Sequence, residues 1–242
     1  MIRLFVSDID GCLAEPYRPF DLDRLRQLAA LVEEAGPFGG QDGAPAFSIC
    51  SGRPYPYVEA MTQVLGVRTP VLFESGGGLF DPESARVCWH PAFTPTVERA
   101  VGTLRAWMRD ELIPGTTMML DHAKRTQAGV IGPDPAEVEA LLPTVRRFVA
   151  DRFPAFSVFS TPVSIDAVPA SITKREGLAW LADRLGCPLD AVAFIGDTDG
   201  DLGALGAVGH AFAPANATGA VKAAAAHVTT GATLAGVLAA YR

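Results

Sequence analysis

Short apolar runs alternate with amphipathic helical patterns along most of the chain, and this alternation constrains the fold more than any other feature. The apolar runs show little polar alternation, which is typical of strands buried on both faces. Strands are predicted at Ile2–Val6, Ala46–Cys50, Pro70–Phe73, Ala191–Ile195 and Gly209–Ala213. Helices are predicted at Asp21–Ala35, Pro54–Leu65, Thr173–Leu185, Asn216–Ala226 and Thr230–Tyr241. This order favours an α/β fold with a Rossmann-like, mainly parallel sheet.

The stretch 89–166 has a different pattern. It combines two predicted helices, Pro95–Arg109 and Pro135–Arg152, with short strand candidates at Met118–Asp121, Ala128–Ile131, Ser157–Phe159 and Ser164–Ala167. Hairpin-like strands beside two helices are typical of an α+β module. We therefore expect a core domain of residues 1–88 and 167–242, with an inserted cap domain of residues 89–166.

Charge and cysteine content limit the expected partners and compartment. The chain has 242 residues and a net charge of −7, which favours neither nucleic-acid nor anionic-membrane binding. No apolar run approaches the roughly 20 residues needed to span a bilayer. The four cysteines are far apart and form no CxxC pair, which argues against a zinc site or a disulfide scaffold. A reduced cytoplasmic compartment, and a monomer or homodimer, are expected.

Two carboxylates, Asp8 and Asp10, follow the first predicted strand directly, and Gly11 comes next. Active sites of open α/β sheets lie at the carboxyl ends of the strands. There, Asp8 could attack phosphorus and form an aspartyl-phosphate, while Asp10 could protonate the leaving oxygen and later activate water. Gly11 permits a tight turn and offers an N–H to an anion.

A second acidic cluster follows the strand Ala191–Ile195. It contains Asp197 and Asp201, and it supplies the carboxylates that a cation between Asp8 and Asp10 would need. Mg²⁺ prefers oxygen ligands and retains several waters. The predicted ligands are the Asp8 side chain, the Asp10 backbone carbonyl and Asp197, with Asp201 as a further ligand or an anchor acting through water.

Three other residues are placed to bind a phosphate group. Ser51 follows a predicted strand and offers a hydroxyl, and Gly52 offers a backbone N–H at a helix N-terminus. Lys174 stands at the start of another predicted helix, where an ammonium can balance the charge of nucleophile and phosphate together.

These four segments resemble the haloacid dehalogenase superfamily of phosphohydrolases, in the family's order. Asp8-Ile9-Asp10-Gly11, Ser51-Gly52-Arg53, Lys174, and Gly196-Asp197 with Asp201 correspond to its four motifs. The spacing is similar to the Cof-like, sugar-phosphatase type with a C2-type cap. The resemblance implies the superfamily's fold, Asp8 as nucleophile, Asp10 as general acid/base and Mg²⁺ as cofactor. Asn216 resembles a family residue found near the substrate, although it could simply cap the next helix.

The expected function is a Mg²⁺-dependent phosphatase acting on a small phosphorylated metabolite through an aspartyl-phosphate. A sugar phosphate, a glycosyl-phosphoglycerate and phosphoglycolate all fit. The alternatives are a sugar phosphomutase of the same fold and a receiver-like phospho-signalling domain. In the cap, Lys124 and Arg125 could bind the non-phosphate part of the substrate, or they could belong to a solvated hairpin loop.

Overall fold

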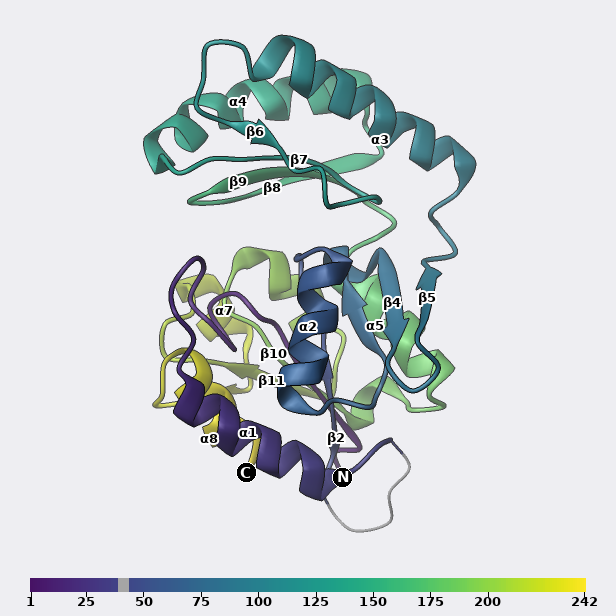
Figure 1. Cartoon of the computed structure of the whole chain (residues 1–242), viewed down its shortest axis with the longest axis vertical. Coiled ribbons are helices and arrows are strands. Elements are labelled where there is room, and N and C mark those ends of the chain that lie inside the picture. Colours follow the sequence, from purple (N-terminus) through teal and green to yellow (C-terminus); the bar gives the residue numbers. More distant parts are fainter. Residues whose placement is uncertain (39–43) are drawn as a thin grey trace. The chain divides into compact units, whose positions relative to one another are not determined.

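The computed structural model describes residues 1–38 and 44–242 (Figure 1). It divides into two compact units. The core unit comprises Met1–Cys88 and Lys174–Arg242, and the inserted unit comprises Trp89–Thr173. The second border thus falls after Thr173, whereas the sequence places it after Asp166. The reason is the strand β9 (Ser164–Pro169), which crosses the expected border and pairs throughout with strands of the inserted unit.

A five-stranded parallel sheet forms the centre of the core unit, which confirms the predicted α/β class. Its order is β12-β11-β10-β1-β2. The strands are β1 (Leu4–Ser7), β2 (Ala46–Ile49), β10 (Val192–Ile195), β11 (His210–Ala213) and β12 (His227–Val228). In the registers of β1, Ser7 lies opposite both Ile195 and Ile49. The carboxyl ends of these three adjacent strands are therefore level, and the loops that follow them meet at one edge.

Helices pack against this sheet in the core unit. They are α1 (Leu22–Ala35), α2 (Tyr55–Leu65), α5 (Lys174–Arg184), α6 (Leu202–Leu205), α7 (Gly219–Ala224) and α8 (Thr233–Tyr241). No helix in the described ranges is long and apolar enough to cross a membrane. The predicted helix from Asn216 is wrong at its start, because the Thr218 hydroxyl caps the helix by accepting a bond from the Val221 N–H.

A short antiparallel sheet extends the core unit, and of its three strands only the first was predicted from the sequence, as Pro70–Phe73. It consists of β3 (Val71–Phe73), β4 (Gly78–Asp81) and β5 (Arg86–Trp89), in that order. A bridge between Cys50 and Leu72 joins β3 to the end of β2 in the parallel sense. The turn before β4 begins with two non-glycine residues in the left-handed region, Glu74 and Ser75 (φ 50° and 56°).

The inserted unit has an antiparallel sheet of order β6-β7-β9-β8. It is built from β6 (Met119–Leu120), β7 (Ala128–Ile131), β8 (Phe156–Thr161) and β9, with the helices α3 (Pro95–Trp107) and α4 (Pro135–Arg152). Thr94 and Asp134 cap the two helices with side-chain oxygens, and each cap is followed by a proline. Buried aliphatic residues from both helices and from the sheet share one core, so this unit has its own hydrophobic interior.

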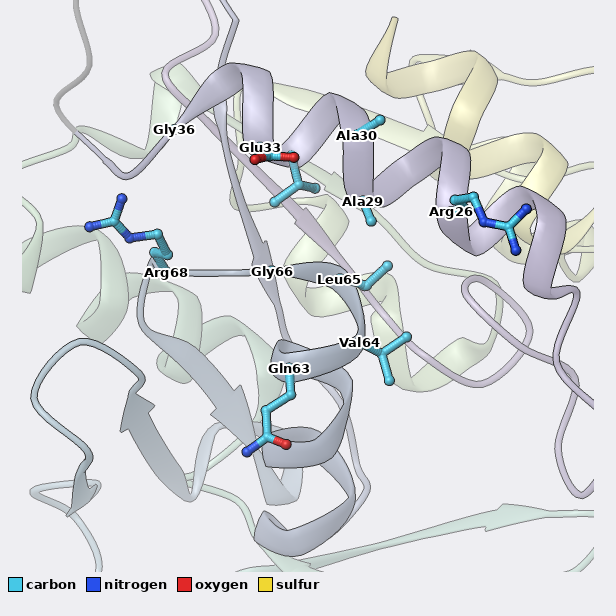
Figure 2. Close-up of a pocket in the computed structure, with 11 residues that line it drawn as sticks. Arg26, Ala29, Ala30, Glu33, Gly36, Gln63, Val64, Leu65, Gly66 and Arg68 are labelled. Atoms are coloured by element: carbon cyan, nitrogen blue, oxygen red, sulfur yellow. The ribbon is translucent and has the colours of Figure 1, made fainter.

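A groove of about 610 Å³ opens between α1 and α2 on the core unit (Figure 2). It is lined mainly by the later turns of both helices, which lead into the amino ends of β2 and β3. Its two arginines are already paired, Arg26 with Asp23 and Arg68 with Glu83. Because its lining residues lie near the amino ends of β2 and β3, the groove is away from the carboxyl ends of the strands, where the acidic residues lie.

Candidate active site

Three carboxylates from two distant segments converge at the carboxyl edge of the parallel sheet. Asp8 follows β1, whereas Asp197 and Asp201 lie in the loop after β10. One oxygen from each lies within 4.8 Å of the other two. Asp8 and Asp201 are buried and Asp197 is partly buried. The level ends of β1 and β10 explain this convergence, because they bring the two acidic loops side by side.

Two glycines allow these carboxylates to approach the backbone. A Cβ atom at Gly11 would lie 1.9 Å from Asp197 Oδ2, and Gly11 has a left-handed φ of +75°. A Cβ atom at Gly196 would lie 2.5 Å from the Asp201 carboxyl carbon. A larger residue at either position would push a carboxylate away, so the glycines are part of the site's construction.

Lys174, the first residue of α5, supplies the cation at the centre of this group. Its Nζ donates to Asp8 Oδ2 at 2.7 Å and to Asp201 Oδ1 at 2.5 Å. The other Asp201 oxygen accepts bonds from the backbone N–H groups of Asp197 and Thr198. Asp201 therefore holds both the Lys174 side chain and the backbone of the loop that carries Asp197.

Negative charge exceeds positive charge in this buried group, which contains three carboxylates and one ammonium. Burial raises the pKa of Asp8 to about 8, although the Lys174 charge opposes the rise, and burial also raises the pKa of Asp197 to about 7. Burial lowers the pKa of Lys174, but the neighbouring Asp201 and Asp8 charges outweigh it, so the net pKa lies well above the usual value. Lys174 thus stays charged, and a further cation in this group would favour the ionised forms of Asp8 and Asp197 at neutral pH.

The donor set fits a divalent cation with oxygen ligands. Asp197 Oδ1 is buried and has no hydrogen-bond partner within the described residues. A buried carboxylate oxygen without a donor is costly unless an ion meets it. The Asp10 side chain is outside the group of three, so its predicted contribution through the backbone carbonyl stays a prediction.

The Asp10 carboxylate instead pairs with Arg53. The Nε and Nη2 atoms of Arg53 donate to the two Asp10 oxygens, both at 2.6 Å. Sequence reasoning assigned no role to Arg53. The available signal was its position in Ser51-Gly52-Arg53, at the carboxyl edge of the strand beside Asp10.

Ser51 and Gly52 lie at the end of β2, at the same edge as Asp8. The buried Ser51 hydroxyl accepts a bond from the Arg53 N–H at 3.2 Å, so its own proton remains available to an acceptor. The left-handed pair Glu74 and Ser75 braces this loop, because their N–H groups donate to the carbonyls of Arg53 and Ser51. Neither residue is a glycine, so no local sequence pattern predicts this left-handed pair.

Asn216 links two loops of the core unit. Its Nδ2 donates to the Gly11 carbonyl at 2.9 Å, and its Oδ1 accepts from the Thr233 N–H at 2.7 Å. Asn216 therefore fixes the turn that carries Gly11, and it is not the cap of α7. Both ends of its amide are used in structural contacts.

The predicted cap residues Lys124 and Arg125 both have partners within the inserted unit. The buried Lys124 ammonium donates to Asp166 at 2.6 Å and lies 3.6 Å from Asp121. Arg125 is half exposed, pairs with Glu98, and lies over the Trp89 ring at 4.8 Å. Their role in substrate binding stays a prediction.

A family model described as haloacid dehalogenase-like hydrolase matches residues 119–240, half of the chain. The chain belongs to this family. The match includes Lys174, Asp197 and Asp201, and it confirms the predicted membership in the superfamily and the prediction of a hydrolytic enzyme. Membership in a hydrolase family disfavours the receiver-like alternative.

Curated relatives named as phosphatases align with most of the chain, and solved structures share its fold. A phosphoglycolate phosphatase of Methanopyrus kandleri is 29% identical over 92% of this chain and 88% of its own. One of Methanothermobacter thermautotrophicus is 26% identical over 100% and 98%. A crystal structure from Thermoplasma acidophilum has a TM-score of 0.78 at 21% identity and covers 98% of this chain and 95% of its own. The sucrose-phosphatase of Synechocystis, solved with sucrose and phosphate, has a TM-score of 0.70 at 14% identity, with coverages of 99% and 97%.

Proposed function

We propose that the protein is a Mg²⁺-dependent phosphatase that hydrolyses a small phosphorylated metabolite through an aspartyl-phosphate on Asp8. The observation that carries the proposal is the contact of Lys174 with Asp8 at 2.7 Å, within a group of three carboxylates whose oxygens lie within 4.8 Å of one another. A buried carboxylate beside a fixed ammonium and an acidic cation site is suited to attack an anionic phosphate.

Asp8, Asp197 and the Asp10 backbone carbonyl would hold the Mg²⁺ ion, with Asp201 supporting Asp197 and contributing a ligand directly or through water. Oxygen donors of this kind suit Mg²⁺. When bound, the ion would offset the charge shared by the carboxylates and the phosphate, which supplies electrostatic stabilisation. The uncompensated charge of three carboxylates against one lysine, together with the unpartnered Asp197 oxygen, supports this assignment.

The chemistry has two steps. An Asp8 oxygen attacks phosphorus, and the bond from phosphorus to the leaving oxygen breaks, its electron pair remaining on that oxygen. Asp10 gives this oxygen a proton, so the alcohol leaves neutral. Water then attacks phosphorus and loses a proton to Asp10 while the bond from phosphorus to Asp8 breaks. Phosphate is released, and both aspartates return to their starting states.

Groups around Asp8 are proposed to bind the phosphate. The Ser51 hydroxyl, the N–H groups of Gly52 and Gly11, and the Lys174 ammonium would contact the phosphate oxygens. Asn216 would act indirectly, through its bond to the Gly11 carbonyl. Lys174 has the further task of balancing the negative charge that grows on the transferring group.

Phosphoglycolate is the first substrate to test, because the curated relatives that align over most of the chain are named phosphoglycolate phosphatases. Sugar phosphates and glycosyl-phosphoglycerates belong in the same panel. Lys124 and Arg125 of the inserted unit are the residues proposed to contact the non-phosphate part. The enzyme is proposed to work in the cytoplasm, and its state as a monomer or homodimer stays a prediction.

A phosphate-release assay over this panel, with and without Mg²⁺, tests the proposal. We expect wild-type protein to release phosphate only with Mg²⁺, and Asp8→Asn to lose turnover while it keeps its fold. Asp23→Asn, on the exposed face of α1, is the matched control and should retain activity. Wild-type turnover by Asp8→Asn would contradict the nucleophile assignment. Transfer of phosphate to a second hydroxyl without release would favour the mutase.

A further inference from the structure

Arg53 makes a two-point contact with Asp10, the residue that the proposed function uses as general acid/base. Arg53 Nε donates to one Asp10 oxygen and Nη2 to the other, each at 2.6 Å. The two side chains are 18% and 30% exposed, so the pair is mostly shielded from solvent. A fork of two parallel bonds fixes the plane of a carboxylate as well as its position.

Two tyrosine rings hold the guanidinium in place. The Arg53 Cζ atom lies 4.9 Å from the ring centre of Tyr17 and 4.9 Å from that of Tyr57. Contacts of this length between a guanidinium and an aromatic ring are favourable. Tyr57 belongs to α2, whereas Tyr17 comes from the segment between β1 and α1, so the guanidinium is held by two separate parts of the core unit.

Tyr17 is held in an unfavourable backbone conformation. Its φ is +56°, in the left-handed region that residues other than glycine seldom adopt, and its side chain is largely exposed. Such strain persists only where other contacts determine the conformation, and it clusters at functional sites. In this conformation the Tyr17 ring contacts the Arg53 guanidinium, which pairs with Asp10.

The Arg53 backbone is fixed as well. Its N–H donates to the Ser51 hydroxyl at 3.2 Å, and its carbonyl accepts a bond from the Glu74 N–H at 3.0 Å. Arg53 therefore connects the proposed phosphate-binding loop to Asp10 through one residue fixed at both backbone and side chain.

We infer that Arg53 is a positioning residue, supported by Tyr17 and Tyr57, that fixes the plane of the Asp10 carboxyl group so that an oxygen lone pair outside the fork carries the transferred proton. The inference rests on the proposed function. Because the fork is engaged with Asp10, Arg53 acts through Asp10 and not as an independent phosphate ligand. Lysine at this position would keep the charge and lose the fixed plane.

A double-mutant cycle on Asp10 and Arg53 tests this inference in the full-length protein with Mg²⁺. Single-turnover rates are measured with an alkyl phosphate for wild type, Arg53→Ala, Asp10→Asn and the double variant. General acid–base groups contribute about 10²–10⁴-fold. We expect Arg53→Ala to cost about 10–100-fold alone, and within about 2-fold in the Asp10→Asn background, because a residue that acts through another loses its effect when that other is gone.

Two further readouts separate positioning from folding or phosphate binding. With p-nitrophenyl phosphate, whose leaving group needs little protonation, the first-step loss in Arg53→Ala should be much smaller than with the alkyl phosphate. Inhibition by inorganic phosphate should be unchanged. Arg53→Lys should keep most of the loss of Arg53→Ala while unfolding at the wild-type temperature. Arg68→Ala, which removes an exposed arginine paired with Glu83, is the control and should leave all rates unchanged.

The failure of this inference differs from failure of the proposed function. If Arg53→Ala multiplies the loss of Asp10→Asn, weakens phosphate inhibition, or is rescued fully by Arg53→Lys, Arg53 is not a positioning residue. Asp8→Asn would still be inactive in each of those cases. If Asp8→Asn keeps wild-type turnover, the proposed function itself fails.

Discussion

Replacement of Lys174 by methionine is the perturbation whose effect follows most directly from the structure. The substitution keeps the length and apolar stem of the side chain and removes the ammonium that contacts Asp8 and Asp201. Both aspartates are buried, so their charges lose their shared partner without gaining access to water. Removing one partner of a buried ion pair costs about 3–5 kcal/mol. For a protein of this size that corresponds to a fall in Tm of about 6–20 °C.

The loss should depend on pH in a direction set by the pKa of Asp8. Burial already raises that pKa to about 8, and the Lys174 charge opposes the rise, so Lys174→Met raises it further. At pH 5 the Asp8 carboxyl is then protonated in the folded variant, and little unpaired charge remains there. As pH rises above about 8, Asp8 ionises in the folded wild type, where Lys174 pairs with it, whereas in the folded variant it must keep its proton or remain as an unpaired buried charge. The deficit in stability should therefore grow as pH rises above about 8.

Thermal unfolding in the presence of a chelator at about pH 6 and about pH 9.5, below and above the Asp8 pKa of about 8, measures this effect. Lys222→Met, on α7, is the matched control and should change Tm by little at either pH. Lys174→Met should also lower the rate of phosphate release by about 10²–10³-fold, the usual cost of one electrostatic contact to a developing charge. An unchanged Tm, or a deficit that shrinks as pH rises, would refute the argument from buried charge.

Three further predictions concern the glycine turn, the cation and the asparagine link. Gly11→Ala should lower the free energy of unfolding by about 2–5 kcal/mol in chemical denaturation, because of its left-handed φ and the clash with Asp197. Gly66→Ala is the control: Gly66 has a similar φ but open space around it, so the loss should be only about 1–2 kcal/mol. Equal losses would argue against the clash. Burial raises the pKa values of Asp8 and Asp197, so their ionisation opposes folding as pH rises from about 4 to 8. The increase in Tm on adding Mg²⁺ should therefore be larger at pH 8 than at pH 5. An equal increase at the two pH values would contradict the cation site. Asn216→Ala should lower the free energy of unfolding by about 1–2 kcal/mol with little change in KM, because both contacts of the Asn216 amide are structural. A large rise in KM would instead indicate that Asn216 contacts the substrate.

The sequence was sufficient to predict the parallel sheet and the meeting of the four motifs. Level strands explain this success, because the apolar runs before Asp8, Ser51 and Asp197 mark strands whose carboxyl ends share one edge. The contact of Lys174 with Asp8 needed only that α5 begin at the same edge. The class of the inserted unit was also evident, since its hairpins and capped helices are local patterns.

Features that depend on long-range contacts were not predicted. In the sheet β3-β4-β5 only β3 was predicted, because β4 and β5 lack a run of strict alternation and the turn before β4 uses left-handed residues that carry no glycine signal. The border after Thr173 depends on β9 pairing with β8, which no local pattern reports. The pairing of Arg53 with Asp10 was not predicted either, because the motif Ser51-Gly52-Arg53 places Arg53 at the carboxyl edge of the sheet without showing which carboxylate its side chain contacts.

The direct test of the account is to find where the phosphoryl group resides during turnover. Asp10→Asn should slow the attack of water and allow the intermediate to accumulate. After reaction with p-nitrophenyl phosphate and Mg²⁺, acid quenching, proteolysis and mass spectrometry should place one phosphoryl group on Asp8, with none in the Asp8→Asn variant. A phosphoryl group on any other residue, or turnover without a covalent intermediate at any quench time, would contradict the claim that Asp8 is the nucleophile.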